Sequence, residues 1–270
     1  MFVKRLLVAI VLLPLGILVI YYGGWGYAAI VGLLCGLTAW EFNSLMRKSG
    51  FQPAQALVIG GTLTLHLQRQ LDGFENSPLV LSLLVLLSMA YHLAAYERGR
   101  NQAAADFAIT LAGIVYLGWI GAYLISLRSL PEGRWWTFLG LSAVWASDIT
   151  AYLVGGRWGR RKLSPRLSPK KTWEGYWASI LGGLVSGAAL EALFLLLGAK
   201  IHPGSGVWIG LAMGALPTLG DLGESMIKRQ AGAKDSSNLL PGHGGVFDRI
   251  DSWLWAAVIC YYMIVTFWLE

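Results

Sequence analysis

The residues best suited to chemistry lie between Ser225 and Asp251. This segment of 27 residues holds four cationic residues, three aspartates, one histidine and a Gly-Gly pair. The chain around it is mostly apolar, and so much charge beside a membrane is costly unless it binds something charged. A metal ion and a polyphosphate would balance these charges. The segment therefore predicts an enzyme that acts at a membrane surface.

Carboxylates in two parts of the chain predict a metal site. If the residues after Gly220 are helical, Asp221 shares a face with Glu224 and Ser225, three and four residues on. Asp248 and Asp251 repeat the three-residue spacing. Mg²⁺ prefers carboxylate oxygens and keeps substrate phosphates in its remaining positions. Each aspartate taken alone could instead be a helix cap or an ion-pair partner.

A second chemical feature is His243-Gly244-Gly245, which lies between these carboxylates. Two successive glycines expose backbone N–H groups that can form an anion-binding nest. We expect Gly244 and Gly245 to approach a phosphate closely. A lone histidine is often structural, so a substrate contact and a structural role for His243 stay equally open.

A second polar stretch, residues 155–175, is rich in lysine and arginine. Asp148 precedes it near the end of an apolar segment, where an ionisable residue is a functional candidate by default. Gly155, Gly156 and Gly159 would allow tight turns. The alternative is a polybasic patch that holds anionic lipid headgroups. The candidate phosphate-binding residues are Arg157, Arg160, Arg161, Lys162, Ser168, Lys170, Lys171 and Thr172.

These polar stretches interrupt a chain that is 56% hydrophobic and only 13% charged. Soluble domains are about 25% charged. We therefore predict an all-α polytopic integral membrane protein with about nine transmembrane helices, of which the third and eighth are short. The predicted helices are Leu6–Tyr22, Trp25–Met46, Ala54–Leu67, Leu79–Tyr96, Phe107–Leu127, Trp136–Val154, Tyr176–Leu197, Val207–Leu219 and Trp253–Leu269.

The positive charges indicate how these helices are oriented. With a cytoplasmic N-terminus, nine alternating helices place 17 of the 21 lysines and arginines inside and four outside, in accord with the positive-inside rule. Both polar loops, 155–175 and 220–252, then lie on the cytoplasmic face. We divide the chain into transmembrane helices at 1–135 and a catalytic membrane region at 136–270.

Composition and missing motifs also limit which ligands the protein binds and which enzyme classes it could belong to. The net charge of +6 comes from cations in short loops, which favours anionic lipids or a phosphorylated substrate over nucleic acid. Cys35 and Cys260 lie inside apolar runs, so neither a disulfide framework nor a cysteine metal site is predicted. The sequence contains no P-loop, H-E-x-x-H or G-x-S-x-G motif, so P-loop NTPases, zinc proteases and serine hydrolases of those types lose their main support.

Two parts of the chain resemble the phosphatidate cytidylyltransferases, also called CDP-diacylglycerol synthases. The first comprises Asp148, Ala151-Tyr152, Gly155-Gly156-Arg157 and the run from Ser168 to Gly175. The second matches the family signature at Ser225-x-Ile227-Lys228-Arg229-x₄-Lys234-Asp235-x-Ser237-x₂-Leu240-Pro241-x-His243-Gly244-Gly245-Val246-x-Asp248-Arg249-Ile250-Asp251. The N-terminal half is similar to the family in general hydropathy only.

The resemblance implies a reaction in which CTP and phosphatidic acid give CDP-diacylglycerol and diphosphate. It implies Mg²⁺ bound by Asp221 and Asp248, a monovalent cation such as K⁺ beside it, and a homodimer in the cell (inner) membrane with a cytoplasm-facing site. The predicted catalytic residues are Asp221, Asp248, Lys228, Arg229 and His243. The predicted substrate-binding residues are Asp148, Arg157, Ser168, Lys170, Lys171, Lys234, Gly244, Gly245 and Arg249.

Two alternatives remain at this point. A CTP-dependent lipid kinase would use similar loops but would transfer the γ-phosphate to a membrane alcohol. A transporter or channel would line an ion path with its buried charges. The crowding of polar residues on one face favours an enzyme over a transporter, whose halves often repeat one another.

Overall fold

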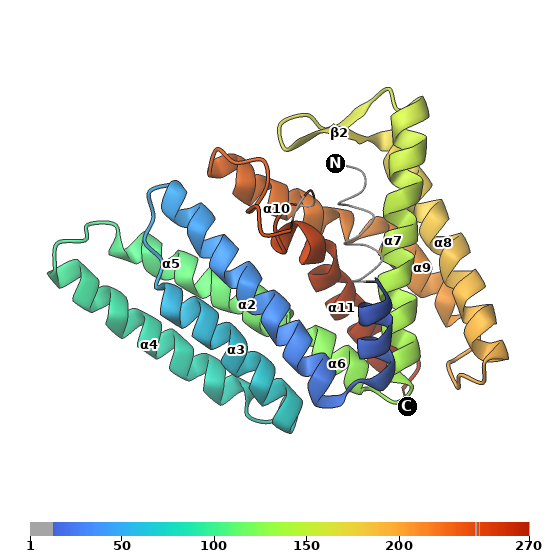
Figure 1. The fold of residues 1–270 in the computed structure, drawn as a ribbon, viewed down its shortest axis with the longest axis horizontal. Helices are drawn as coiled ribbons and strands as arrows, with labels where there is room; N and C mark the ends of the chain where they lie inside the picture. The colour runs from blue at the N-terminus through green and yellow to red at the C-terminus, as the bar shows by residue number, and fades with distance from the viewer. Residues whose placement is uncertain (1–12, 241, 243, 270) are drawn as a thin grey trace. The chain divides into compact units, whose positions relative to one another are not determined.

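The computed structural model describes residues 13–240, 242 and 244–269, and its elements are almost all helices (Figure 1). Packing divides the chain into two compact units, which are described separately. Unit 1 combines the residues up to 126 with residues 227–250, and unit 2 combines residues 127–226 with those from 251 onward. The sequence analysis divides the chain differently, between residues 135 and 136. That division stays a prediction.

Unit 1 is a bundle of neighbouring helices. Its core brings together Leu65, Leu84 and Ile114, which are at most 8% exposed. Between membrane helices such aliphatic side chains stabilise the bundle by van der Waals packing. The elements are α2 (Gly24–Lys48), α3 (Gln55–Asp72), α4 (Ser77–Glu97), α5 (Ala103–Gly113), the π-helix η1 (Ile114–Ile120) and α6 (Tyr123–Ser129), which runs on into unit 2.

The turn between α2 and α3 is held by side chains of α5. Asp106, 1% exposed, accepts hydrogen bonds from the Gln52 N–H at 2.7 Å and from Arg100 Nε at 2.6 Å. Thr110 accepts the Ala54 N–H at 3.0 Å. A buried backbone N–H without a partner is costly, and these contacts satisfy two of them. They thereby hold the turn that follows α2, the helix that carries Glu41.

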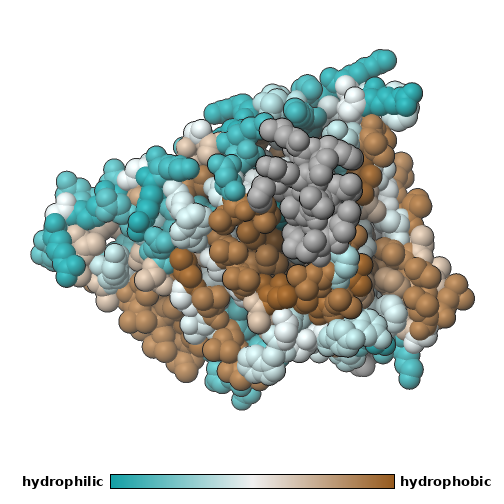
Figure 2. Space-filling view, in the orientation of Figure 1, coloured by the Kyte–Doolittle hydropathy of each residue, from teal (hydrophilic) through white to brown (hydrophobic). Residues whose placement is uncertain are grey.

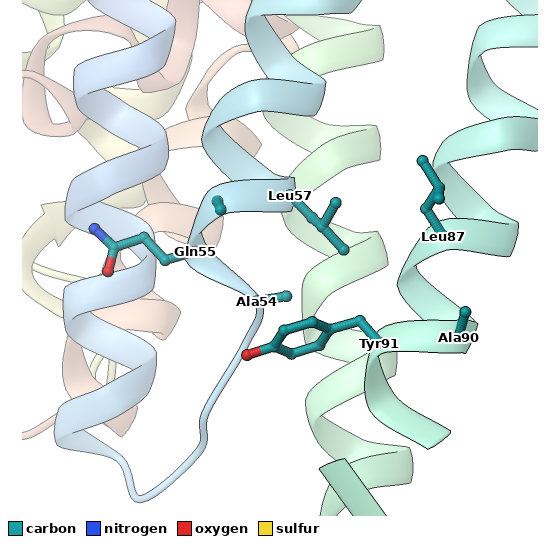
Figure 3. A pocket seen from close by; sticks show the side chains of 7 residues that line it. Ala54, Gln55, Leu57, Leu87, Ala90 and Tyr91 are labelled. Carbon is teal, nitrogen blue, oxygen red and sulfur yellow. The ribbon is translucent and has the colours of Figure 1, made fainter. Parts of the chain in front are cut away.

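An apolar groove of about 420 Å³ lies between the start of α3 and the end of α4 (Figure 3). Leu57 and Leu87 point into it from opposite helices, and Tyr91 lies at one end. Among the residues that the structure describes, those lining the groove include no acid and no base. The groove therefore lacks the groups that metal or phosphate chemistry requires.

Unit 2 contains the whole of α7, α8 and α9, most of α10 and α11, and a β-hairpin. In Figure 1, α7 runs beside α8, and the hairpin lies at the end of α7. Strands β1 and β2 are antiparallel, with Lys162 opposite Thr172 and Ser164 opposite Ser168. The elements are α7 (Gly133–Trp158), β1 (Lys162–Ser164), β2 (Ser168–Thr172), α8 (Trp173–Leu196), α9 (Ser205–Ala215), α10 (Thr218–Gln230) and α11 (Phe247–Phe267); α10 runs from unit 2 into unit 1, and α11 runs from unit 1 into unit 2.

Glycines bring α8 and α9 into backbone contact. A Cβ on Gly187 would meet the Gly206 carbonyl, and a Cβ on Gly210 would meet the Gly183 carbonyl. Small residues four apart allow membrane helices to approach this closely. The two helices therefore pack with no side chain between their axes at these positions.

Six of the described helices are long and apolar enough to cross a membrane. Their sequences supply the roughly 20 apolar residues that a span needs. The predicted count of nine spans is not confirmed, because α3 and α9 are not among the six and residues 6–12 of the predicted span Leu6–Tyr22 lie outside the described residues. The six are Gly24–Lys48, Ser77–Glu97, Ala103–Ser129, Gly133–Trp158, Trp173–Leu196 and Phe247–Phe267.

The surface has the hydropathy of an integral membrane protein. In unit 1, hydrophobic residues cover the outer face of α4, and hydrophilic residues gather around the loop that follows it (Figure 2). In unit 2, hydrophobic residues cover α8 and hydrophilic residues surround the hairpin. Leu86 and Leu181 are both 65% exposed, which suits a lipid-facing position and not a water-facing one.

Both predicted polar loops contain regular secondary structure that the sequence analysis did not predict. Gly155 and Gly156 do not form turns, because α7 continues through them to Trp158. Gly155 instead allows close packing, since a Cβ there would lie 2.9 Å from Thr172 Oγ1. The predicted loop 220–252 is helical over about half of its length: α10 extends to Gln230, and α11 begins at Phe247.

Candidate active site

Three carboxylates of unit 2 converge to form what we call the carboxylate cluster: Asp221, Glu224 and Asp251. One oxygen atom of each lies within 4.8 Å of the others. Glu224 is 1% exposed and Asp251 is 8% exposed, whereas the Asp221 side chain is 36% exposed. Like charges this close repel each other strongly unless a cation or a proton compensates them.

The cluster depends on helix geometry and on one glycine. Because α10 is helical from Thr218, Asp221 and Glu224 lie on one face. Asp251 comes from α11. Gly220 lets the two helices approach, since a Cβ there would lie 2.7 Å from the Asp251 carbonyl oxygen and 2.7 Å from Trp255 Cδ1.

Lys171 brings a positive charge to the cluster. Its Nζ forms an ion pair with Asp221 Oδ2 at 2.7 Å, and Ser225 Oγ donates a hydrogen bond to Asp221 Oδ1 at 3.4 Å. Asp148 of α7 interacts electrostatically with both Lys171 and Asp221. The structure therefore groups Asp148, Lys171 and Asp221, which come from three separate elements.

The hairpin determines which lysine reaches the cluster. Successive side chains of a strand point to opposite faces, so Lys170 and Lys171 diverge. Lys171 contacts Asp221, and Lys170 is exposed. The base of the hairpin is fixed by Thr172, which accepts the Gly175 N–H at 3.2 Å, and by Glu174, which accepts the N–H groups of residues 160 and 161 at 3.1 and 3.2 Å.

The donor set of the cluster fits a hard divalent cation. Mg²⁺ is held by one or two carboxylates together with water and substrate phosphates. Asp221 is the most exposed member and is the one a phosphate could approach. Lys171 beside it would supply a point charge to the same phosphate. The residues present therefore suit a metal-bound polyphosphate.

Asp248 belongs to a separate network in unit 1, which we call the Asp248 network: Asp248, Lys228, Ser236 and Gly245. Lys228 Nζ lies 2.5 Å from Asp248 Oδ1. Asp248 Oδ2 accepts hydrogen bonds from Ser236 N at 2.9 Å, Ser236 Oγ at 2.7 Å and Gly245 N at 2.8 Å. The ion pair is almost fully buried, with side-chain exposures of 10% and 8%.

This network gives the Gly-Gly pair an observed role. Gly244 has φ +83°, and a Cβ there would lie 2.8 Å from Asp248 Oδ2. The Gly245 N–H donates to the Asp248 carboxylate in this structure. A phosphate contact by this pair and metal binding by Asp248 stay predictions.

The remaining predicted site residues lie in more open positions. Arg229 closes the turn after α10 through a 3.0 Å hydrogen bond to the Ala233 carbonyl. Ser168 begins β2. His243 lies outside the described residues. The exposed cations of the predicted set are Arg157, Lys170, Arg229, Lys234 and Arg249.

The list of predicted site residues omits three buried acids that the structure singles out, although the sequence analysis notes the spacing of Glu224 and Asp251. Glu224 and Asp251 complete the carboxylate cluster, and their three-residue spacing from Asp221 and Asp248 was the available signal. Glu41 is 0% exposed and contacts residues near Asp248. A carboxylate inside an apolar span was the signal for Glu41.

Comparison with known proteins agrees with this chemistry. The model of the cytidylyltransferase family matches residues 3–267. A phosphatidate cytidylyltransferase of Synechocystis sp. is 31% identical, covering 97% of this chain and 96% of the relative. One of Brucella abortus is 34% identical, covering 95% and 91%. One of Bacillus subtilis is 40% identical over 59% of this chain and 58% of its own. The chain therefore belongs to the cytidylyltransferase family and is a nucleotidyltransferase enzyme of the membrane.

Proposed function

We propose that this protein is a Mg²⁺-dependent phosphatidate cytidylyltransferase, which converts CTP and phosphatidic acid to CDP-diacylglycerol and diphosphate. The proposal rests on one observation. This chain, a member of the cytidylyltransferase family, has three carboxylates within 4.8 Å of one another, and Lys171 forms an ion pair with one of them. The relatives whose names give this activity align along nearly the whole chain.

The proposed reaction needs no nucleophile from the protein. An oxygen of the phosphatidate phosphate bonds to the α-phosphorus of CTP, the bond from that phosphorus to the bridging oxygen breaks, and diphosphate leaves with the electron pair. The main barrier is the approach of two anions, so catalysis rests on positioning and electrostatics. A bound Mg²⁺ would supply Lewis-acid stabilisation of the phosphate oxygens.

The side chains of the site divide this work. Asp221, Glu224 and Asp251 would hold the metal, and Asp221 is the most open to phosphate. Asp248 and Lys228 keep the catalytic roles predicted from the sequence. Lys171 would move from Asp221 toward the nucleotide phosphates as they bind. Asp148 would keep Lys171 oriented through the charge interaction between them. The acyl chains of the lipid would stay in the bilayer.

The remaining parts of the proposal concern the cellular setting. We propose that the protein lies in the cell (inner) membrane with its N-terminus and active site facing the cytoplasm, as a homodimer, and that a monovalent cation such as K⁺ assists Mg²⁺. The distribution of lysine and arginine supports the orientation. Replacing KCl by an organic-cation salt in the assay tests the role of K⁺.

Product analysis tests the function directly. Purified protein in detergent is given phosphatidic acid, Mg²⁺ and CTP labelled at either the α- or the γ-phosphate. We expect the α-label to appear in a lipid product and the γ-label in diphosphate. Transfer of the γ-label to lipid would identify a kinase. Absence of a CTP-dependent reaction with any Mg²⁺ concentration would contradict the proposal.

Lys171→Ala is expected to weaken nucleotide use much more than Lys170→Ala. Lys171 contacts Asp221, whereas Lys170 points away from the cluster. Loss of a hydrogen bond to a charged group costs about 1.5–3 kcal/mol, which corresponds to about 10- to 100-fold in the apparent KM for CTP. Steady-state kinetics of both variants measure the difference. Equal effects would show that the strand does not select between the two lysines.

A further inference from the structure

Glu41 of α2 is a buried carboxylate that the proposed mechanism does not use. It is 0% exposed, yet it lies in a helix that is apolar enough to cross a membrane. An isolated buried carboxylate is costly unless it is well hydrogen-bonded. Its partners therefore show why the chain keeps an acid at this position.

Four hydrogen-bond donors to Glu41 come from the segment Ser236–Phe247, about 200 residues along the chain. Glu41 Oε1 accepts hydrogen bonds from Ser237 Oγ at 2.5 Å and Val246 N at 2.9 Å. Glu41 Oε2 accepts them from Ser236 Oγ at 3.0 Å and Phe247 N at 2.7 Å. Each carboxylate oxygen thus holds both ends of the segment.

The segment also leaves room for the Glu41 carboxylate. A Cβ on Gly245 would lie 2.7 Å from Glu41 Cδ and would also collide with Ser236 Oγ. Only glycine therefore allows the backbone to close on Glu41. The same residue donates its N–H to Asp248, so the Glu41 contacts and the Asp248 network share Gly245.

Ser236 joins the two acids directly. Its Oγ lies 3.0 Å from Glu41 Oε2 and 2.7 Å from Asp248 Oδ2. One hydroxyl proton can serve only one acceptor at a time, so Glu41 Oε2 and Asp248 Oδ2 compete for the Ser236 proton. A shift of Glu41 would move Ser236, and with it two of the donors that fix Asp248.

We propose that Glu41 is a positioning residue: from α2 it holds the segment Ser236–Phe247 and thereby places Asp248 and Lys228 for nucleotidyl transfer. This inference rests on the proposed function for its link to turnover. Outer partners of this kind commonly change metal affinity or activity by about 10- to 100-fold when they are removed. Such a residue acts through the segment and need not touch a substrate.

The experiment compares Glu41→Gln with Glu41→Asp. Glutamine keeps the size of the side chain but offers one oxygen acceptor, so it cannot accept from both pairs of donors. Aspartate keeps both oxygens and the charge, although it is one methylene shorter. We expect Glu41→Gln to lower kcat by about 10- to 100-fold and Glu41→Asp to retain more activity. A purely space-filling role predicts the opposite order, and that order would overturn the proposal.

Hydrogen exchange gives a readout that does not depend on activity. Amide exchange measured by mass spectrometry should accelerate in peptides that cover residues 236–247 in Glu41→Gln. Glu191→Gln is the matched control, because Glu191 is also a buried glutamate, 6% exposed, that accepts the backbone N–H groups of Gly204 and Gly206. Unchanged exchange at 236–247 in Glu41→Gln, or equal acceleration there in Glu191→Gln, would overturn the proposal.

The two readouts separate the failure of this inference from the failure of the proposed function. If the wild-type protein makes no CDP-diacylglycerol but Glu41→Gln still loosens residues 236–247, the function is wrong and the positioning stands. If the wild type is active and Glu41→Gln is unaffected, only the positioning is wrong. Should both Glu41 variants fail to fold, Ser237→Ala removes one hydrogen bond to Glu41 together with the one that Ser237 Oγ accepts from Leu239 N. It should accelerate the same peptides to a smaller degree, and no acceleration would overturn the inference.

Discussion

Asp221→Asn is expected to abolish Mg²⁺-dependent turnover while leaving the protein as stable as the wild type. The amide removes one negative charge from the carboxylate cluster and weakens its hold on a divalent cation. We expect kcat to fall at least about 100-fold, the upper end of the loss seen when a group that merely supports a metal is removed. The Asp221–Lys171 pair is about one-third exposed, so its loss costs only about 0–1 kcal/mol of stability.

Activity at rising Mg²⁺ concentrations and the thermal unfolding midpoint in detergent measure the two effects. Asp72→Asn is the control, because Asp72 is an exposed aspartate at the end of α3 that bonds to Asn76. It should behave like the wild type in both assays. Near-normal turnover of Asp221→Asn at limiting Mg²⁺ would contradict the metal site.

Asp248→Asn is expected to lose both turnover and stability. The two oxygens of Asp248 face different partners: Oδ1 faces the Lys228 ammonium, and Oδ2 accepts three hydrogen bonds. An asparagine that keeps its oxygen toward Ser236 and Gly245 turns its NH₂ group toward another donor. Breaking a buried ion pair from one side costs about 3–5 kcal/mol. The melting temperature should therefore fall, although the protein still reaches the membrane fraction.

A double variant separates the two losses. In Asp248→Asn with Lys228→Gln, the buried cation is gone and the two amides can bond to each other. We expect most of the stability to return, while turnover stays low because neither charge is restored. An Asp248→Asn protein that is as stable as the wild type would show that the 2.5 Å pair contributes little. Recovery of turnover in the double variant would show that Asp248 is not required for catalysis.

The helices could be predicted from the sequence because lipid imposes a simple rule on apolar length. The segments Trp25–Met46 and Leu79–Tyr96 correspond to α2 and α4 with shifts of only one or two residues at each end. The rule also explains the weaker cases. Short apolar segments such as the one that forms α9 are too short for their length to show whether they cross the membrane.

The site could be predicted only in part, because spacing fixes neighbours on one helix but not the partners of that helix. Asp221 and Glu224 lie on the same face because the segment that carries them is the helix α10. The inclusion of Asp251 depends on how closely Gly220 lets α10 approach α11, and sequence spacing does not contain that information. The hairpin was missed because a strand of three residues and a strand of five give too little alternation to recognise.

Contacts between distant parts of the chain were the hardest to predict. Glu41 and Ser236 are separated by 195 residues, so no local pattern joins them. A buried acid in an apolar helix raises the suspicion of function, but Glu191 gives the same signal and holds only the start of α9. A buried acid in an apolar helix therefore predicts that the acid has an important partner, but it does not predict which residue that partner is.

The contact between α8 and α9 restricts how unit 2 can move. Where the Gly183 and Gly187 backbones touch those of Gly206 and Gly210, no side chains can change rotamer to absorb sliding. Packed elements shear past one another only by small adjustments of intervening side chains. The two helices should therefore move together as one rigid body. Any opening of unit 2 that admits a lipid should then occur at other helix–helix contacts of this unit.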